Sequence, residues 1–115
     1  MSKEEILEQE WKAIVHDLSA KFSDGDPLPI DSIIYLIGVQ ELGKGSGDFT
    51  KDDKINLMHI AVCKLLEPYD YYKFSHKDDE GWPHYTILKQ LPNLKPEQQN
   101  ELMKKAIVNY FDTTS

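Results

Sequence analysis

Apolar residues recur at spacings of three and four in three stretches of the chain, which is the pattern of a helix with one buried face. The first stretch opens with Ser2 and Glu5, whose spacing is that of a capping box. Another opens with the same kind of box at Thr50 and stops before Pro68, and the last begins at Pro96. These patterns predict three amphipathic helices.

Residues 31–42 are apolar on nearly every side, which is typical of a helix in the middle of a domain. Asp31 is expected to cap its first turn, and Gly43 is placed to end it in a left-handed conformation. A buried strand over 32–37 is the alternative, because a short apolar run has no diagnostic period. The cap at Asp31 and the helical neighbours favour the helix.

The stretch 69–94 has two interpretations. Four aromatic residues precede a polar turn at 76–81, and a short hairpin around that turn is one of them. We favour the other, a loop followed by a short helix that begins at Pro83. The residues that this helix would turn inward are Ile87, Leu88 and Leu91.

Together these elements predict an all-α fold. Four principal helices and one short helix would form a compact bundle around the central apolar helix near 31–42, in a single domain over 1–115. A chain of 115 residues buries enough surface for one core without disulfides or metal. The chain shows no internal repeat and no linker.

The charge balance limits the partners. The formal net charge is −7, and none of the 13 basic residues is an arginine. Arginine pairs bidentately with phosphate and guanine, so its absence argues against nucleic acid and anionic membranes. No apolar run approaches the roughly 18 to 20 residues of a membrane span. Cys63 has no internal disulfide partner and the chain opens with charged residues, unlike a signal peptide, so we expect a cytoplasmic protein.

Three segments carry a resemblance to a protein family: ELGKG at 41–45, TKDDK at 50–54 and DDEGWPH at 78–84. With them, the whole chain resembles a small family of uncharacterised bacterial proteins from Bacteroidetes. The resemblance implies an all-helical fold. It implies no activity, so it transfers no functional residue to this chain.

One string resembles a phosphate-binding loop. Gly38, Gly43 and Lys44 have the spacing of the first part of a P-loop. Gly45 stands where that loop needs a serine or threonine for magnesium, and no helix opens directly after it. A helix end followed by a loop explains the string, so we expect no nucleotide binding.

His59 and Cys63 lie four residues apart, so they share a helix face and could both hold zinc. Two ligands are too few, and neither His76 nor His84 completes the set at a diagnostic spacing. A boundary histidine and a small buried cysteine of raised pKa and low reactivity are the simpler interpretation. We predict no metal and no cofactor.

Glu41 is the most unusual single residue. It falls in the last turn of the apolar helix, where the helix dipole disfavours a carboxylate, so a neighbour such as Lys44 should offset it. It is either a structural brace for the glycine-rich loop or a ligand-binding or catalytic group. Trp82, beside Pro83 and His84, similarly either fills the core or lines a binding surface.

The function that the sequence favours is a small binding or protein-interaction module. It would use the glycine-rich loop 43–49 and the region around Trp82, with a protein or a small molecule as partner. The alternative is a small enzyme with Glu41 and either His59 or His84 as acid and base. A homodimer is compatible with both. The candidate ligand-binding residues are Gln40, Glu41, Lys44, His59, Trp82 and His84.

Overall fold

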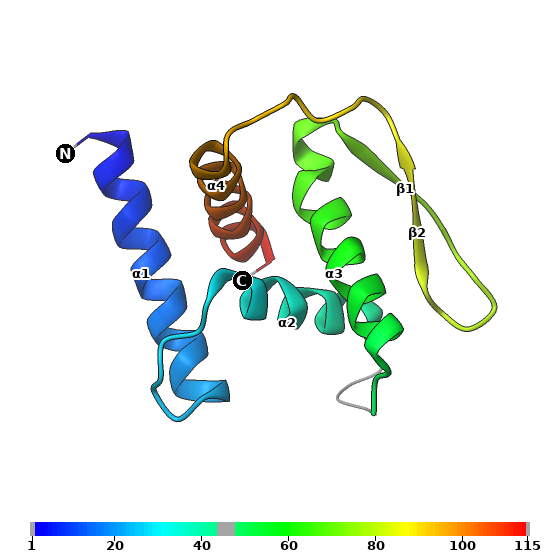
Figure 1. The fold of residues 1–115 in the computed structure, drawn as a ribbon, viewed down its shortest axis with the longest axis horizontal. Helices are drawn as coiled ribbons and strands as arrows, with labels where there is room; N and C mark the ends of the chain where they lie inside the picture. Colours follow the sequence, from blue (N-terminus) through cyan, green and yellow to red (C-terminus); the bar gives the residue numbers. More distant parts are fainter. Residues whose placement is uncertain (1, 44–47, 115) are drawn as a thin grey trace. The chain divides into compact units, whose positions relative to one another are not determined.

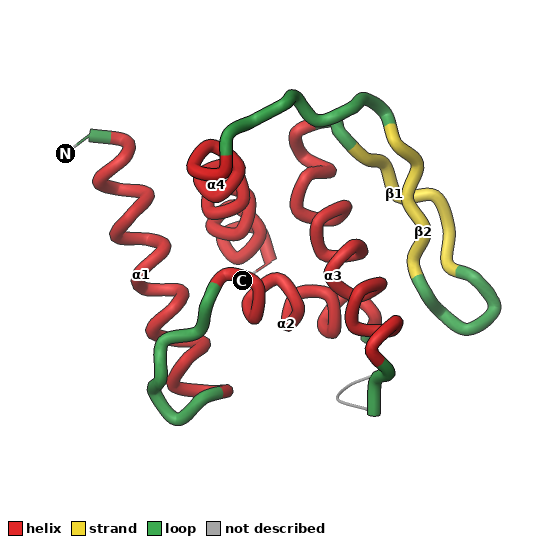
Figure 2. The backbone as a smooth tube through the Cα atoms, in the orientation of Figure 1, coloured by secondary structure: helices red, strands yellow, loops and turns green. Residues whose placement is uncertain are grey.

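A computed structural model describes residues 2–43 and 48–114 of the chain (Figure 1). These residues form four α-helices, a short 3-10 helix and a two-stranded antiparallel sheet. The all-α prediction is therefore wrong, because the protein is mainly helical with a small sheet (Figure 2). In chain order the elements are α1 (Lys3–Phe22), α2 (Ile30–Leu42), α3 (Lys51–Leu66), η1 (Glu67–Tyr69), β1 (Tyr72–Lys77), β2 (Pro83–Ile87) and α4 (Pro96–Thr114).

The chain forms two compact units. One unit joins residues 1–33 to residues 94–115, and the other consists of residues 34–93. The boundary at residue 33 falls inside α2, so this helix begins in one unit and ends in the other. The single domain over 1–115 stays a prediction.

In the first unit, α1 and α4 lie side by side (Figure 1). An ion pair joins Lys104 Nζ to Glu8 Oε2 at 3.7 Å, and the same ammonium lies 5.7 Å from the centre of the Trp11 ring. Ser19 is buried, and its hydroxyl accepts a hydrogen bond from the Leu28 N–H at 3.0 Å. This bond fixes the loop after α1, because it satisfies a loop amide with a buried side chain.

The helix starts predicted at Ser2 and Thr50 are confirmed. Thr50 Oγ1 accepts from the Asp53 N–H at 3.1 Å, and the Asp53 carboxylate accepts from the Thr50 N–H at 3.0 Å, which completes the capping box of α3. At α1, Ser2 Oγ accepts from the Glu5 N–H at 3.2 Å, while the Glu5 carboxylate accepts from the Ser2 hydroxyl. The side-chain hydrogen bonds of Ser2 and Thr50 therefore fix where these two helices begin.

The helix predicted over 31–42 is also confirmed, and it rules out a strand at 32–37. It begins at Ile30, so Asp31 lies in the first turn and the expected N-cap is wrong. Gly43 ends it with a φ of 74°, and its N–H donates to the Val39 carbonyl at 3.2 Å. The sequence thus located the end of the helix better than its start.

The second unit is built on α3, which contacts both strands of the hairpin. The His59 ring meets the Tyr72 ring edge-on, with 6.4 Å between centroids. Directly after the last residue of α3, Glu67 Oε2 accepts a hydrogen bond from the Phe74 N–H of β1 at 2.8 Å. The buried residues of α3 are Leu57, Ile60, Ala61, Cys63, Leu65 and Leu66.

The hairpin replaces the short helix expected to begin at Pro83. That residue instead pairs with Lys77 at the first position of β2, where a strand tolerates proline. An aromatic pair across the two strands stabilises the pairing, because Phe74 stands opposite Tyr85 with ring centroids 5.7 Å apart. The residues expected to turn inward are exposed: Ile87 by 66%, Leu88 by 52% and Leu91 by 42%.

Gly38 lets α2 approach the backbone of α3 within the second unit. A Cβ added at Gly38 would lie 2.1 Å from the Leu57 carbonyl oxygen and 2.7 Å from its carbon. Leu57 itself is fully buried, so this part of the α3 backbone has no room to retreat. The first glycine of the P-loop-like string is therefore a helix-packing residue, and Lys44 of that string lies outside the described residues.

We predict that Gly38→Ala destabilises the protein by about 1–3 kcal/mol, the usual cost of overpacking. In a helix without this contact, glycine to alanine would stabilise by roughly 1 kcal/mol, so the sign of the change tests the contact. Urea unfolding followed by circular dichroism measures it. Gln40→Ala, at an exposed position of the same helix, should change the free energy of unfolding by less than about 0.5 kcal/mol. A more stable Gly38→Ala protein would contradict the close packing.

Candidate functional site

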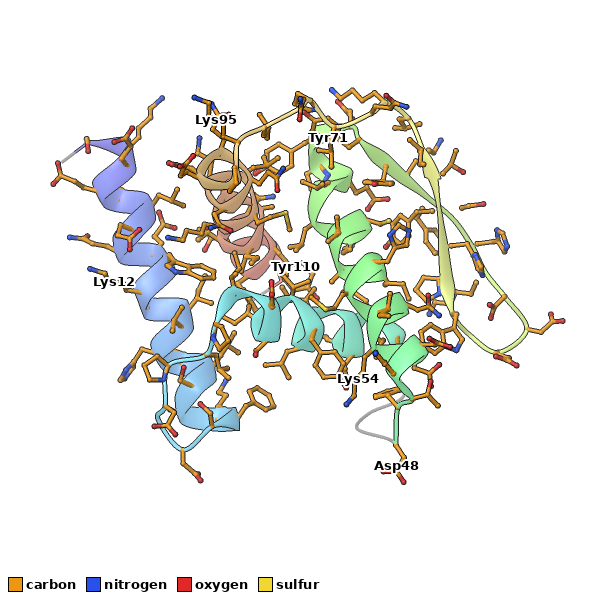
Figure 3. The ribbon with its side chains drawn as sticks, in the orientation of Figure 1. Lys12, Asp48, Lys54, Tyr71, Lys95 and Tyr110 are labelled. Atoms are coloured by element: carbon orange, nitrogen blue, oxygen red, sulfur yellow. The ribbon has the colours of Figure 1, made fainter. Side chains whose placement is uncertain are left out.

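A depression lies between the N-terminal half of α3 and the tip of the hairpin, inside the second unit. Its volume is about 320 Å³. Figure 3 shows the side chains between these two elements. The helix lines it with Asp53, Asn56, His59 and Ile60, and the hairpin lines it with Asp78, Glu80, Trp82, Pro83 and His84.

Asp78 organises the hairpin side of the depression. Its Oδ1 accepts from the Glu80 N–H at 3.0 Å and from the Trp82 N–H at 2.9 Å. The backbone closes the same turn, because the Asp78 N–H donates to the Trp82 carbonyl and the Gly81 N–H donates to the Asp78 carbonyl, both at 2.9 Å. Gly81 has a φ of 88°, a conformation that glycine adopts without strain.

The second oxygen of Asp78 holds an imidazole. Asp78 Oδ2 lies 2.9 Å from His84 Nε2, and the His84 ring stacks on the His76 ring with 5.0 Å between centroids. The hydrogen bonds from His84 and from the Trp82 and Glu80 amides lower the pKa of the Asp78 carboxyl. The carboxylate at the tip of the hairpin is thus kept ionised and held in one orientation.

His59 and Cys63 form a pair on α3, with 3.6 Å between Cys63 Sγ and His59 Nε2. Cys63 is 1% exposed, and burial raises its pKa to about 11. The predicted burial of Cys63 is confirmed. Its low reactivity stays a prediction, which the raised pKa supports because the thiolate is the nucleophile. His59 lies in the depression, whereas Cys63 does not line it.

The structure separates the predicted site residues. His59, Trp82 and His84 meet in the depression, whereas Gln40 and Glu41 of α2 do not line it. Lys44, together with Gly45, Ser46 and Gly47 of the glycine-rich loop, lies outside the described residues. The lining residues that the sequence did not point to are Asp53, Asn56, Ile60, Asp78, Glu80 and Pro83.

Glu41 acts on a different group. Tyr85 is half-buried on β2, and its phenol has a raised pKa because it is desolvated and because the carboxylates of Glu67 and Glu41 oppose its ionisation. Glu41 thus lies within electrostatic reach of a hairpin tyrosine. Its role as a brace or as a binding group stays a prediction.

Other candidate sites are weaker. A groove of about 650 Å³ in the first unit has only carboxylates, one amide, one hydroxyl, one lysine and Leu7 in its lining. Among residues 2–43 and 48–114, no three histidine, cysteine or acidic side chains are grouped so as to hold a metal ion. In the same part of the chain, no helix has the length and apolar character needed to cross a bilayer.

Comparisons with protein-family models, with curated proteins and with solved structures find no match for this chain. The resemblance to bacterial proteins of Bacteroidetes stays a prediction.

The turn at Asp78 should respond to acid. Because its folded-state pKa is lowered, the carboxylate stabilises the turn above the ordinary pKa of 3.8, and this contribution is lost as the pH falls through the lower folded value. We predict that the Glu80 and Trp82 amide resonances titrate together with a midpoint below 3.8. Asp78→Asn keeps one acceptor oxygen, so it should keep the turn and lose this transition. A midpoint at or above 3.8 would count against the arrangement.

Proposed function

We propose that the protein is a binding module whose depression between α3 and the hairpin holds an organic cation, either an ammonium or a guanidinium group. The observation that carries the proposal is the lining itself. Three carboxylates, those of Asp53, Asp78 and Glu80, line it together with Trp82, and no lysine is among the lining residues that the structure describes. Such a site attracts positive charge and repels anions.

Two of the carboxylates are fixed before any ligand arrives. Asp53 is held by the Thr50 N–H in the capping box, and Asp78 is held by two amides and an imidazole. Preorganised groups lose little conformational entropy on binding, so more of their interaction energy becomes affinity. The depression therefore needs no rearrangement of these two side chains to receive a cation.

Trp82 supplies the second half of the recognition. Tryptophan is the aromatic side chain that attracts cations most strongly, and a cation over its face gains about 0.5–1 kcal/mol at an exposed site. Ile60 and Pro83 add apolar surface to the lining, which suits the methylene chain that carries an ammonium. Asn56 and the two imidazoles offer further polar contacts.

The expected affinity is modest. Exposed ion pairs contribute about 0.2–1 kcal/mol each, so three carboxylates and one aromatic ring support a dissociation constant no tighter than the order of millimolar. Because the contacts are solvent-accessible and ionic, the affinity should fall as salt is added. A binding module of this strength uses the depression as one contact within a larger interface.

A catalytic role is less well supported. The His84–Asp78 pair resembles the base and orienting carboxylate of a hydrolase, but the depression contains no serine, threonine or cysteine side chain in the part of the chain that is described. The nearest thiol, Cys63, is buried and has a raised pKa. We therefore place recognition ahead of chemistry.

The cellular compartment and the classes of partner are proposed from the composition of the chain. We propose a cytoplasmic protein, supported by the single cysteine, which is a buried free thiol. Nucleic acid and anionic membranes are poor partners for a chain of net charge −7 without arginine. No metal and no cofactor enter the proposal, and a homodimer remains a prediction.

The proposal is tested with protein labelled with 5-fluorotryptophan, whose two tryptophans report separately by ¹⁹F NMR. N-acetyl-lysinamide should shift the Trp82 resonance with a dissociation constant on the order of millimolar or weaker at low salt. Trp11, which is 8% exposed and lies outside the depression, should not move. N-acetyl-norleucinamide has the same chain without the charge, and it should leave both resonances unchanged.

Paired variants supply the control. Glu80→Gln removes a carboxylate of the depression and should weaken binding about two- to fivefold, whereas Asp79→Asn makes the same charge change one residue away and outside the lining. Equal losses of affinity in the two variants would mean that binding responds only to the net charge of the protein, and not to the carboxylate of Glu80. Equal shifts with the lysine and norleucine compounds would overturn the cation proposal.

A further inference from the structure

An irregularity in the hairpin brings two imidazoles face to face. Phe74 stands opposite Tyr85, so an unbroken register would place Ser75 opposite His84. The register instead shifts between Phe74 and His76, which makes His76 the partner of His84. A bulge of this kind inserts one residue and re-aims the side chain that follows it. The two rings consequently stack, with 5.0 Å between centroids and 10° between their planes.

The two rings of this histidine pair differ in their hydrogen-bond partners. His84 Nε2 lies 2.9 Å from Asp78 Oδ2, and a carboxylate only accepts, so Nε2 carries the hydrogen and Nδ1 is left to take a proton. His76 Nδ1 lies 2.9 Å from the Ser75 hydroxyl, an uncharged group that donates or accepts. A positive charge on His84 therefore has a carboxylate beside it, whereas one on His76 has a hydroxyl.

The elements around the histidine pair carry other groups that are charged or can become charged near neutral pH. They are Asp53 and His59 of α3, Glu67 of η1, Lys73 and Lys77 of β1, and Asp78, Asp79 and Glu80 of the turn. Asp78 is the one that is hydrogen-bonded to the pair. His59 is the other imidazole, so a change of pH acts on it as well. A test must therefore observe the two stacked rings themselves.

We propose that the histidine pair is a pH-sensitive element of the hairpin tip, which keeps its rings stacked with one proton and separates them with two. The first proton goes to His84, where the Asp78 carboxylate turns the hydrogen bond into an ion pair. The second makes both rings cationic, and like charges at this distance repel even in water. Because Asp78 holds His84 and because His76 is exposed, His76 is the ring that moves away.

The separation of the rings would reach the depression through His84, which lines it. Histidine changes its charge between about pH 5 and 8. The carboxyl of Asp78 has a pKa lowered from 3.8, so it stays ionised over that range and keeps its bonds to the Glu80 and Trp82 amides. Acid therefore adds positive charge beside the depression while the turn stays closed. The histidine pair itself does not depend on the proposed binding of a cation.

The test uses NMR of the protein without ligand. Nuclear Overhauser effects between the ring protons of His76 and His84 should be present at about pH 8 and at least about twofold weaker at about pH 5, because the charged rings repel. The effects between the Phe74 and Tyr85 rings should stay, because the hairpin does not unfold. Loss of both sets would show that acid opens the whole hairpin, which would overturn the proposal.

Two variants assign the cause. His76→Phe keeps a flat ring that takes no proton, so its contact with His84 should persist at both pH values. His59→Gln removes the third imidazole and should leave the separation of His76 from His84 unchanged. Rings that stay together at pH 5 in the unaltered protein, or that also separate in His76→Phe, would contradict charge repulsion as the switch.

The affinity for N-acetyl-lysinamide answers a separate question. If the depression binds a cation, the affinity should fall about two- to fivefold from pH 8 to pH 5, and it should fall less in His76→Phe. Separation of the rings in a protein that binds N-acetyl-lysinamide at neither pH would support the histidine switch and overturn the cation proposal. Rings that stay stacked in a protein that binds the compound would overturn the switch alone.

Discussion

The carboxylate of Asp78 holds the candidate site together. One oxygen accepts from the amides of Glu80 and Trp82, and the other lies 2.9 Å from His84 Nε2. Three lining residues therefore take their positions from one side chain. The same charge that orders the turn also contributes to the negative potential of the depression, on which the proposed binding of a cation depends. Two backbone hydrogen bonds, from the Asp78 N–H to the Trp82 carbonyl and from the Gly81 N–H to the Asp78 carbonyl, close the same turn.

A steric constraint complements this electrostatic one. Gly38 gives α2 a surface on which the backbone of α3 can lie directly, because a Cβ would stand 2.1 Å from the Leu57 carbonyl oxygen. The opposite side of α3 receives aromatic residues of the hairpin, such as Tyr72 against His59. Thr50 thus fixes the start of α3, and α2 packs against its backbone. The hairpin borders the residues of α3 that line the depression.

Local signals in the sequence predicted the helices well. Thr50 and Asp53 fix a helix start through bonds between near neighbours, and Gly43 ends a helix through its own backbone preference. The hairpin was the less favoured of the two interpretations because Pro83 fits the first turn of a helix as well as the first residue of a strand. Tyr72 and Phe74 at a spacing of two, followed by a turn with glycine and by Tyr85, were the signal that favoured strands.

The site was only half predictable for a physical reason. His59, Trp82 and His84 were selected by residue type, and the fold brings them together. Their carboxylate neighbours show only local roles in the sequence: Asp53 belongs to the capping box that opens at Thr50, and Asp78 lies in the polar turn at 76–81. Both do have structural bonds, and both also line the depression. For such a residue the sequence indicates only the local structural role. The place in the depression depends on the packing of α3 against the hairpin, and the sequence pattern did not decide whether that hairpin forms.

The central claim is that a cation sits beside Trp82 between α3 and the hairpin. Intermolecular nuclear Overhauser effects with N-acetyl-lysinamide test it most directly. We predict contacts from the ε-methylene protons of the ligand to the Trp82 indole and to Ile60, with none to Trp11. Contacts confined to the glutamate-lined groove of α1 and α4, or no contacts with Trp82 at saturating ligand, would contradict it.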